Sequence, residues 1–438
     1  MIGIYKKCMN RKKIIFKNVS LGFFYKILNM AIVFTTIPLL LNYLEKEQYG
    51  VWVTIFSLVN IVFFVDAGIG NGLKTKLSEA LSLKNLKLAK SYISTAYISI
   101  FFISLIVLCI GIACVFLINF QNLFNTIIPE NELKTVLLVI LFLVITSFVL
   151  NLYKSFYYAN QQASKVELAM LIYQIIVLIS ITFLLYFFPR KLLFVALFYG
   201  SANIFIGIVF TLLFFRKNKK IQPSIASFSK DKVKDLMGLS LAFFGVQLCM
   251  IVIFTTDNLI ISKLLGPSEV TNYDIVYKLF QVVITISVIV QDPFWALYTD
   301  AFQKKDFEWI KKTIIRLNKL FVVFLFIIIG LFFLSKPLIK IWIQRDLLIP
   351  TSLILFMSLF VLIRVYGIIY MTFLNSIGKV KLQLWLYFFG AIINIPLSIY
   401  FVKTFDLGSS GVILGTVFSI LSLSIILPIQ TFQILQKQ

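Results

Sequence analysis

The chain has 438 residues, of which 60% are hydrophobic and only 13% are charged. Soluble domains carry about 25% charged residues, so the composition excludes a soluble enzyme and predicts an all-α polytopic membrane protein. The formal net charge of +23 would favour nucleic-acid binding in a soluble protein, but here the basic residues lie between apolar runs, which is typical of membrane loops.

The residue types needed for metal binding and covalent catalysis are scarce. The chain has no histidine, and Cys109, Cys114 and Cys249 lie inside apolar runs, where we interpret them as packing residues. The sequence also has no phosphate-binding glycine loop followed by Lys-Ser or Lys-Thr. We therefore expect no metal, no cofactor and no enzyme activity.

Apolar runs recur along the whole chain. A helix needs about 20 apolar residues to cross a bilayer, and the first run, after a basic tail, is too long for a cleaved signal peptide. About twelve spanning helices are predicted, at 20–43, 49–73, 91–118, 134–156, 166–188, 192–215, 237–265, 272–298, 313–335, 349–374, 381–401 and 411–434.

The distribution of Lys and Arg sets the expected orientation. If the N-terminus is cytoplasmic, 29 of the 41 basic residues lie in cytoplasmic segments, 9 lie outside and 3 lie within spans. This bias follows the positive-inside rule and places both termini in the cytoplasm. The longest connection, 216–236, is basic and falls at the midpoint of the chain.

Short motifs indicate an internal repeat. Tyr49 at the start of span two matches Tyr273 at the start of span eight at an offset of 224, whereas Glu79 matches Asp300 at 221, so a three-residue gap is needed. A second match pairs Lys165 with Lys379 at 214. A parallel repeat predicts two six-helix lobes, at 1–218 and 237–438, joined by a cytoplasmic linker at 219–236 and enclosing a central cavity.

Charged residues within spans are costly and are the best site candidates. Arg364 lies about fifteen residues into span ten and is interpreted either as an anchor for an anionic headgroup or as half of a structural pair. Asp257 in span seven is either a group that titrates with protons or cations, or a capping residue where the helix loosens near Thr255 and Thr256.

Three other charges lie nearer the ends of spans. Lys26 and Lys278 either face the cavity and bind substrate or extend towards the membrane surface. Asp66 precedes a glycine cluster and is either a pairing residue or a structural one.

Several segments resemble bacterial polysaccharide repeat-unit flippases of the O-antigen and capsule type. They are 257–267 (DNLIISKLLGP), 49–52 (YGVW), 66–73 (DAGIGNGL) and 375–381 (NSIGKVK). The resemblance covers nearly the full length and implies the multidrug/oligosaccharidyl-lipid/polysaccharide exporter superfamily. It implies transport of undecaprenyl-diphosphate-linked oligosaccharides across the bacterial inner membrane. It further implies H⁺ or Na⁺ as coupling ion and partners among polysaccharide assembly proteins.

Two alternatives remain. A multidrug or cation antiporter of the same superfamily would favour acidic residues in the first lobe, where span one has Lys26 instead. A polysaccharide polymerase or ligase would carry a long external loop with basic catalytic residues, and every expected external loop is short.

Overall fold

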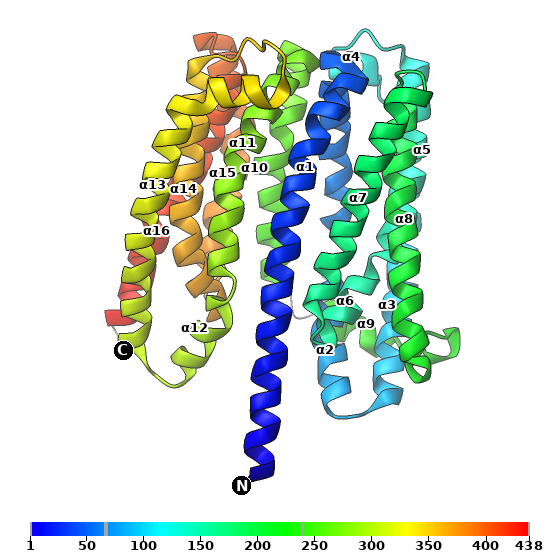
Figure 1. The fold of residues 1–438 in the computed structure, drawn as a ribbon, viewed down its shortest axis with the longest axis vertical. Coiled ribbons are helices and arrows are strands. Elements are labelled where there is room, and N and C mark those ends of the chain that lie inside the picture. Colours follow the sequence, from blue (N-terminus) through cyan, green and yellow to red (C-terminus); the bar gives the residue numbers. More distant parts are fainter. Residues whose placement is uncertain (1, 65–68, 238–240, 437–438) are drawn as a thin grey trace. The chain divides into compact units, whose positions relative to one another are not determined.

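The computed structural model describes residues 2–64, 69–237 and 241–436, and all regular structure in these ranges is helical (Figure 1). The all-α prediction is confirmed. Two compact units are present. Unit 1 comprises Met1–Glu45, Val59–Gln121 and Ile128–Leu241, and unit 2 comprises Lys46–Leu58, Asn122–Ile127 and Ala242–Gln438. The units thus follow the two halves of the chain except for two short segments of the first half that belong to unit 2.

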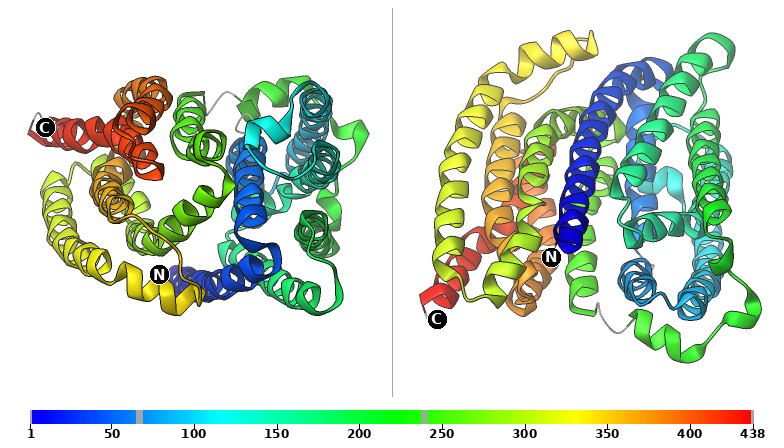
Figure 2. Two further views of the ribbon diagram at one scale, coloured as in Figure 1. Left: turned by 90° about the horizontal axis from the view of Figure 1, so that it is seen from above. Right: turned by 60° about the horizontal axis from the view of Figure 1, so that its bottom comes forward.

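Within each unit the long helices run side by side (Figures 1 and 2). Unit 1 contains the first part of α1 (Ile2–Phe64), then α2 (Ile69–Ser82), α3 (Leu86–Leu117), α5 (Glu130–Leu150), α6 (Leu152–Ala159), α7 (Ala163–Phe187), α8 (Leu192–Lys217), η1 (Lys219–Ile221), η2 (Ile225–Ser227) and α9 (Lys230–Met237). Unit 2 contains Lys46–Leu58 of α1, most of α4 (Phe120–Phe124), and α10 (Leu241–Leu265), α11 (Pro267–Gln291), α12 (Phe294–Gln303), α13 (Phe307–Ile343), α14 (Thr351–Ser376), α15 (Lys381–Phe405) and α16 (Ser409–Gln436).

In the described residues, eleven helices are long and apolar enough to span a membrane. One of them, Ser20–Val59, covers parts of two expected spans, because α1 continues through Glu45, whose backbone is not helical (φ 63°, ψ 177°). Eleven helices with one such kink agree with the expected number of about twelve.

Three expected spans have different boundaries. The span expected at 134–156 is broken at Asn151 between α5 and α6, and that at 272–298 is broken between α11 and α12, just before Pro293 takes the N-cap position of α12. The span expected at 313–335 lies within the 37-residue helix α13. Hydropathy marks apolar runs, but it does not locate a break inside one.

The backbone gives a simpler register for the internal repeat. Residues with positive φ lie 221 residues apart, at Glu45 within α1 and Gly266 before α11, and again at Lys84 and Lys305 before the N-caps of α3 and α13. The N-caps of α3 and α13 have the same offset, since Asn85 and Asp306 each accept a hydrogen bond from the backbone N–H three residues later. The match of Tyr49 with Tyr273 is therefore wrong by three residues.

The second sequence match is also displaced. Helix α7 begins at Ala163 and α15 at Lys381, an offset of 218, whereas Lys165 and Lys379 were aligned at 214. The displacement is about one helical turn, which returns side chains to nearly the same helix face. A slip of this size preserves the hydropathy pattern, so the sequence alone could not exclude it.

Aromatic side chains pack the core of unit 1. Phe156 of α6 lies between two residues of α8, with ring centroids 5.3 Å from Phe214 and 5.4 Å from Phe215. Tyr157 donates a hydrogen bond to the carbonyl of Phe210 at 3.2 Å. These contacts hold the short helix α6 against α8.

Small residues set the packing of α15 on α16. A Cβ at Gly415 would lie 2.5 Å from Ser398 Oγ, and a Cβ at Gly390 would lie 2.5 Å from the carbonyl of Ser419. Close approach of helix backbones through Gly and Ser is typical of helix pairs in lipid, where burial of apolar surface gives little driving force.

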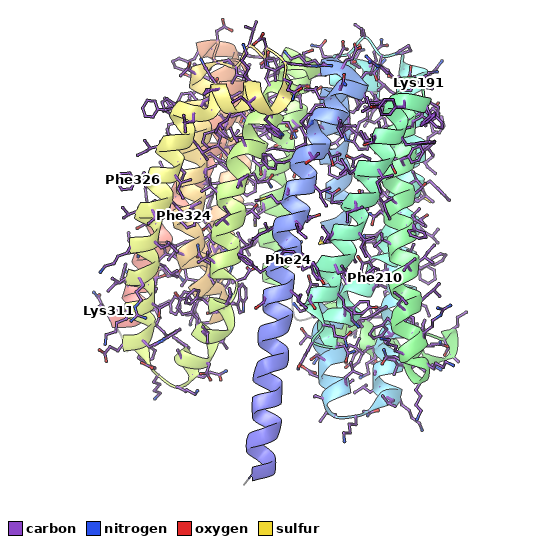
Figure 3. All side chains as sticks on the ribbon, viewed as in Figure 1. Phe24, Lys191, Phe210, Lys311, Phe324 and Phe326 are labelled. Carbon is purple, nitrogen blue, oxygen red and sulfur yellow. The ribbon has the colours of Figure 1, made fainter. Side chains whose placement is uncertain are left out.

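Many large apolar side chains point away from the protein. Figure 3 shows Phe326 projecting outward from α13, where its side chain is 67% exposed. Phe102, Phe187 and Phe333 are also exposed. So large an exposed apolar surface requires an apolar solvent, in agreement with a membrane protein.

Gly50 is the position at which we expect the fold to tolerate a side chain least. A Cβ there would lie 1.8 Å from the carbonyl oxygen of Pro267. We predict that Gly50→Ala lowers stability by about 3 kcal/mol or more, because overpacking forces backbone to move. Thermal unfolding in detergent measures the loss. The matched control is Gly330→Ala in α13, where no atom lies within 4 Å, and equal unfolding temperatures for the two variants would contradict the prediction.

Candidate functional site

Arg364 lies at the middle of α14, about 20 Å along the helix from Thr351. Its guanidinium carbon is 4.4 Å from the centroid of the Phe254 ring, and Nη1 donates to the Tyr387 hydroxyl at 3.4 Å. Its Nε is buried without a hydrogen-bond partner, and no carboxylate within the described ranges lies within 4.0 Å of it. The pairing of Arg364 with a buried acid is therefore not observed in this part of the chain.

The ring of Phe254 belongs to an aromatic cluster from three helices. Phe254 of α10 and Tyr277 of α11 both contact Phe360 of α14, with centroids 6.0 and 6.2 Å away. Tyr273 stacks on Tyr277 at 6.4 Å. The negative faces of such rings attract a guanidinium by about 0.5–2 kcal/mol, which holds its plane while leaving its edge free to donate.

Asp257 lies one turn beyond Phe254 in α10 and is 3% exposed. It accepts hydrogen bonds from the Tyr273 hydroxyl at 2.7 Å and from Thr416 Oγ1 at 3.0 Å. Thr416 accepts in turn from Asn394 Nδ2 at 3.0 Å. Helix α10 is continuous through Asp257, so the interpretation of this residue as a cap in a loosened helix is wrong.

Two features distinguish the Asp257 centre from an ordinary buried carboxylate. No basic side chain of the described residues lies within 4.0 Å of it, and Asn394 Oδ1 is buried without a donor. The carboxylate, the hydroxyl and the unused amide oxygen are hard oxygen ligands of the kind that bind a metal cation. Alternatively, the buried carboxylate can take up a proton.

Lys278 is paired within its own helix. Its Nζ lies 3.3 Å from Asp274 Oδ1, and Asp274 Oδ2 accepts from the Tyr49 hydroxyl at 2.8 Å. Asp274 is almost fully buried. Much of the Lys278 charge is therefore balanced by Asp274.

Lys26 belongs to unit 1 and lies 3.9 Å from Glu167 of α7. Asp66, the remaining predicted site residue, lies outside the described residues. Of the five predicted site residues, the structure brings Arg364 and Asp257 into one polar and aromatic core, through Phe254 and Tyr273. In the described ranges no three His, Cys, Asp or Glu side chains converge on a metal site.

Two first-half segments complete unit 2 through polar contacts. The Thr271 hydroxyl donates to the carbonyl of Lys46 at 2.5 Å, and Asn258 Nδ2 donates to Ser57 Oγ at 2.7 Å. Ser262 donates to the carbonyl of Phe124 at 2.7 Å. Helices α10 and α11 are thus hydrogen-bonded to residues that lie between 138 and 225 positions earlier in the chain.

Sequence reasoning missed the partners of the predicted site residues, both charged and uncharged. Asp274 could have been found, because it lies four residues before Lys278 and this spacing forms ion pairs on helices. Glu167 could not have been found by spacing, because it pairs with Lys26 from a different helix. No sequence signal distinguished Asn394 and Thr416 from other polar residues in apolar helices.

The chain is similar in structure to solved multidrug transporters. An inward-facing MATE family transporter of the MOP superfamily aligns with a TM-score of 0.74 and 14% identity over 95% of both chains. An outward-facing MATE transporter aligns at 0.68 and 13% identity over 96% of both chains. At this identity the likeness establishes the fold: a polytopic helical membrane protein with the MATE transporter fold.

Sequence comparison gives the family. The family described as "Polysaccharide biosynthesis protein" matches residues 15–292, and MatE matches residues 242–400. The first match covers more than half of the chain, which therefore belongs to the polysaccharide biosynthesis protein family.

Two curated relatives come from enteric bacteria. The "Putative O-antigen transporter" of Salmonella typhimurium is 32% identical over 185 residues, which span 41% of this chain and 42% of that protein. The "Putative O-antigen export protein" of Yersinia pseudotuberculosis is 24% identical over 416 residues, or 90% of both chains.

The hydroxyl of Thr416 offers a test of the Asp257 centre. We predict that Thr416→Val lowers the stability of the protein by about 1–3 kcal/mol, because a buried carboxylate loses a donor. Thermal unfolding of the purified protein measures the change. Thr431→Val is the matched control, since Thr431 is equally buried on α16 and its hydroxyl has no hydrogen-bond partner. A loss of equal size in both variants would refute the role of Thr416.

Proposed function

We propose that this protein is a flippase that carries undecaprenyl-diphosphate-linked oligosaccharide repeat units from the cytoplasmic to the outer face of the bacterial inner membrane. Arg364 carries the proposal. It is a cation at the middle of a membrane helix, held by a ring and a hydroxyl, and its buried Nε has no partner. An anionic phosphate would satisfy both the charge and the unused donor.

Transport without bond cleavage is consistent with these residues. The lipid tail remains in the bilayer, and the protein lowers the cost of moving a polar head through hydrocarbon. The family membership and the names of the two O-antigen relatives support a polysaccharide-linked cargo. The excess of basic residues in the segments assigned to the cytoplasm supports the placement of both termini there.

Asp257 is proposed as the site of the coupling ion, either H⁺ or Na⁺. The supporting observation is its set of oxygen atoms: the carboxylate, the hydroxyls of Tyr273 and Thr416, and the unused Asn394 Oδ1. Binding of a cation would give the buried charge the partner that it lacks among the described residues.

A second candidate is a multidrug or cation antiporter. The match of residues 242–400 to MatE and the buried Asp257 favour it, since an acidic residue can bind a cationic drug. Arg364 opposes it, because a buried cation repels such a substrate.

The deciding experiment locates the sugar of the lipid-linked oligosaccharide in a deletion strain. We expect the sugar to remain on the cytoplasmic side without the protein and to reach the outer face when the gene is restored. Normal translocation in the deletion strain, together with increased drug sensitivity, would instead establish the antiporter.

Arg364 is tested by substitution in the same assay. We predict that Arg364→Ala reduces translocation about ten- to hundredfold, the value of a hydrogen bond to a charged group, while the protein still inserts and accumulates. Arg316→Ala, at an exposed position on α13, is the control and should be silent. Wild-type translocation by Arg364→Ala would remove this residue from the site.

Asp257→Asn tests the coupling ion. The substitution keeps the size of the side chain but abolishes its charge, so we predict that residual translocation no longer depends on the Na⁺ or proton gradient. Translocation is measured with and without an ionophore that collapses each gradient. Asp300→Asn, exposed on α12, should keep the dependence of the wild type. A gradient dependence that persists in Asp257→Asn would locate coupling elsewhere.

A further inference from the structure

The last turns of α13 are bent away from the rest of the helix. Residues 320–335 of this helix carry no charge and cover about 24 Å of membrane, so Lys319 and Lys336, which bound this run, lie near the two membrane surfaces. Pro337 follows directly, and because proline has no N–H it leaves the carbonyl of Phe333 without its helical donor and bends the helix. Figures 1 and 2 show the end of α13, in yellow, turned across the end of unit 2.

The bent end of α13 has the composition of a segment that lies in a membrane surface. It contains Trp342, and the apolar side chain of Ile341 is 74% exposed. In the loop that follows, 344–350, Leu348 is 88% exposed. Exposed apolar residues next to lysine and tryptophan are typical of helices at the boundary between lipid headgroups and acyl chains. We therefore expect this end of unit 2 to contact lipid.

The bent end of α13 and the loop after it enclose a cavity of about 470 Å³. Among the nine described residues that line the cavity, Lys336, Lys340 and Arg345 are basic, Asp346 is acidic and the other five are apolar. The charged residues of the lining thus sum to +2. The volume lies within the range of about 300–1,000 Å³ that is usual for sites of small ligands.

The lysines of this cavity have partners that an anion can replace. Lys340 Nζ lies 2.9 Å from Asp346 Oδ1, but these side chains are 71% and 85% exposed, and exposed ion pairs contribute little free energy. Lys336 Nζ donates to the hydroxyl of Thr351 at 2.9 Å, which is a neutral acceptor. A phosphate oxygen would bind either ammonium group more strongly than a hydroxyl does.

Helix α11 holds the loop in place from behind. Asn272 is fully buried in α11 and donates from Nδ2 to the carbonyl of Leu348 at 3.3 Å. Glu269 accepts hydrogen bonds from Asn272 at 3.0 Å and from Ser409 at 3.3 Å, and it is not among the residues that line the cavity. The cavity is thus supported by buried contacts, and the carboxylate of Glu269 is directed to other donors.

The position of the three basic residues departs from the charge bias of the chain. Nine of the 41 basic residues fall in the segments assigned to the outer face, and three of these nine lie within the ten residues 336–345. A concentration of Lys and Arg on this side works against the positive-inside rule, so it indicates a local role.

We infer that this cavity, the α13 end pocket, binds the headgroup of an anionic phospholipid of the surrounding bilayer. Arg345 binds the phosphate through paired N–H donors, and Lys336 binds it as a point charge. Ile341 and Leu348 contact the acyl chains, whereas a free sugar or a free phosphate ion would leave these two side chains in water. The inference does not rest on the proposed function.

Native mass spectrometry of the purified full-length protein tests the inference. The probes are phosphatidylglycerol, phosphatidylcholine with the same acyl chains, and inorganic phosphate. We expect the wild type to bind its first phosphatidylglycerol more tightly than its first phosphatidylcholine. Lys336→Gln and Arg345→Gln should each weaken the affinity for phosphatidylglycerol about fivefold, the value of one basic residue near an anionic lipid surface, and leave that for phosphatidylcholine unchanged.

Two further variants keep the result interpretable. Asp346→Asn removes the acid of the α13 end pocket and should strengthen phosphatidylglycerol binding about fivefold, whereas a purely structural effect would not raise the affinity. Lys403→Gln is the matched control, because Lys403 is an exposed lysine in another segment assigned to the outer face, and it should bind as the wild type does.

The other outcomes overturn the inference. Equal affinity of the wild type for the two lipids, or wild-type affinity in both Lys336→Gln and Arg345→Gln, would remove the α13 end pocket as a lipid site. An equal loss in Lys403→Gln would assign the preference to net charge alone. Displacement of phosphatidylglycerol by inorganic phosphate would assign the pocket to a free anion. None of these results bears on the flippase, which the sidedness of the sugar in cells tests separately.

Discussion

One constraint governs this structure: a charge or a hydrogen-bonding group that has no partner in an apolar medium costs free energy. Backbone N–H and C=O groups pair with one another in the helices that make up most of the described residues. Polar and charged side chains are paired less completely. Lys278 pairs with Asp274 and Lys26 with Glu167, whereas Arg364 and Asp257 have no ionic partner in the described ranges. These are therefore two places where a partner of opposite charge would lower the free energy most.

The sequence predicted the membrane-spanning helices but not the breaks within them, and the register of the internal repeat required the backbone angles. Hydropathy repeats with the helical period, so an alignment shifted by about one turn looks as good as the correct one. The positive φ angles at Glu45 and Gly266, and the caps at Asn85 and Asp306, have no such ambiguity, because each marks a single residue and does not recur with the helical period. They fix the offset of 221 residues.

The site was predictable to the extent that it depends on charge. Arg364 and Asp257 were identified because ionised groups are rare in spans, and the structure places both near α10. Their neutral partners could not be identified in this way. Thr416 and Asn394 resemble the many polar residues that pack helices in lipid, and their role depends on which helices meet. The break at Asn151 could not be identified either, because it is invisible to hydropathy and the sequence predicts one continuous span over 134–156.

The chemistry of Arg364 determines how the proposed substrate would be held. The guanidinium of Arg364 is planar, lies over a ring and keeps a buried donor, so a phosphate bound there would be largely dehydrated and held in one orientation. Loss of Arg364 should therefore slow transfer even when the carrier lipid is saturating.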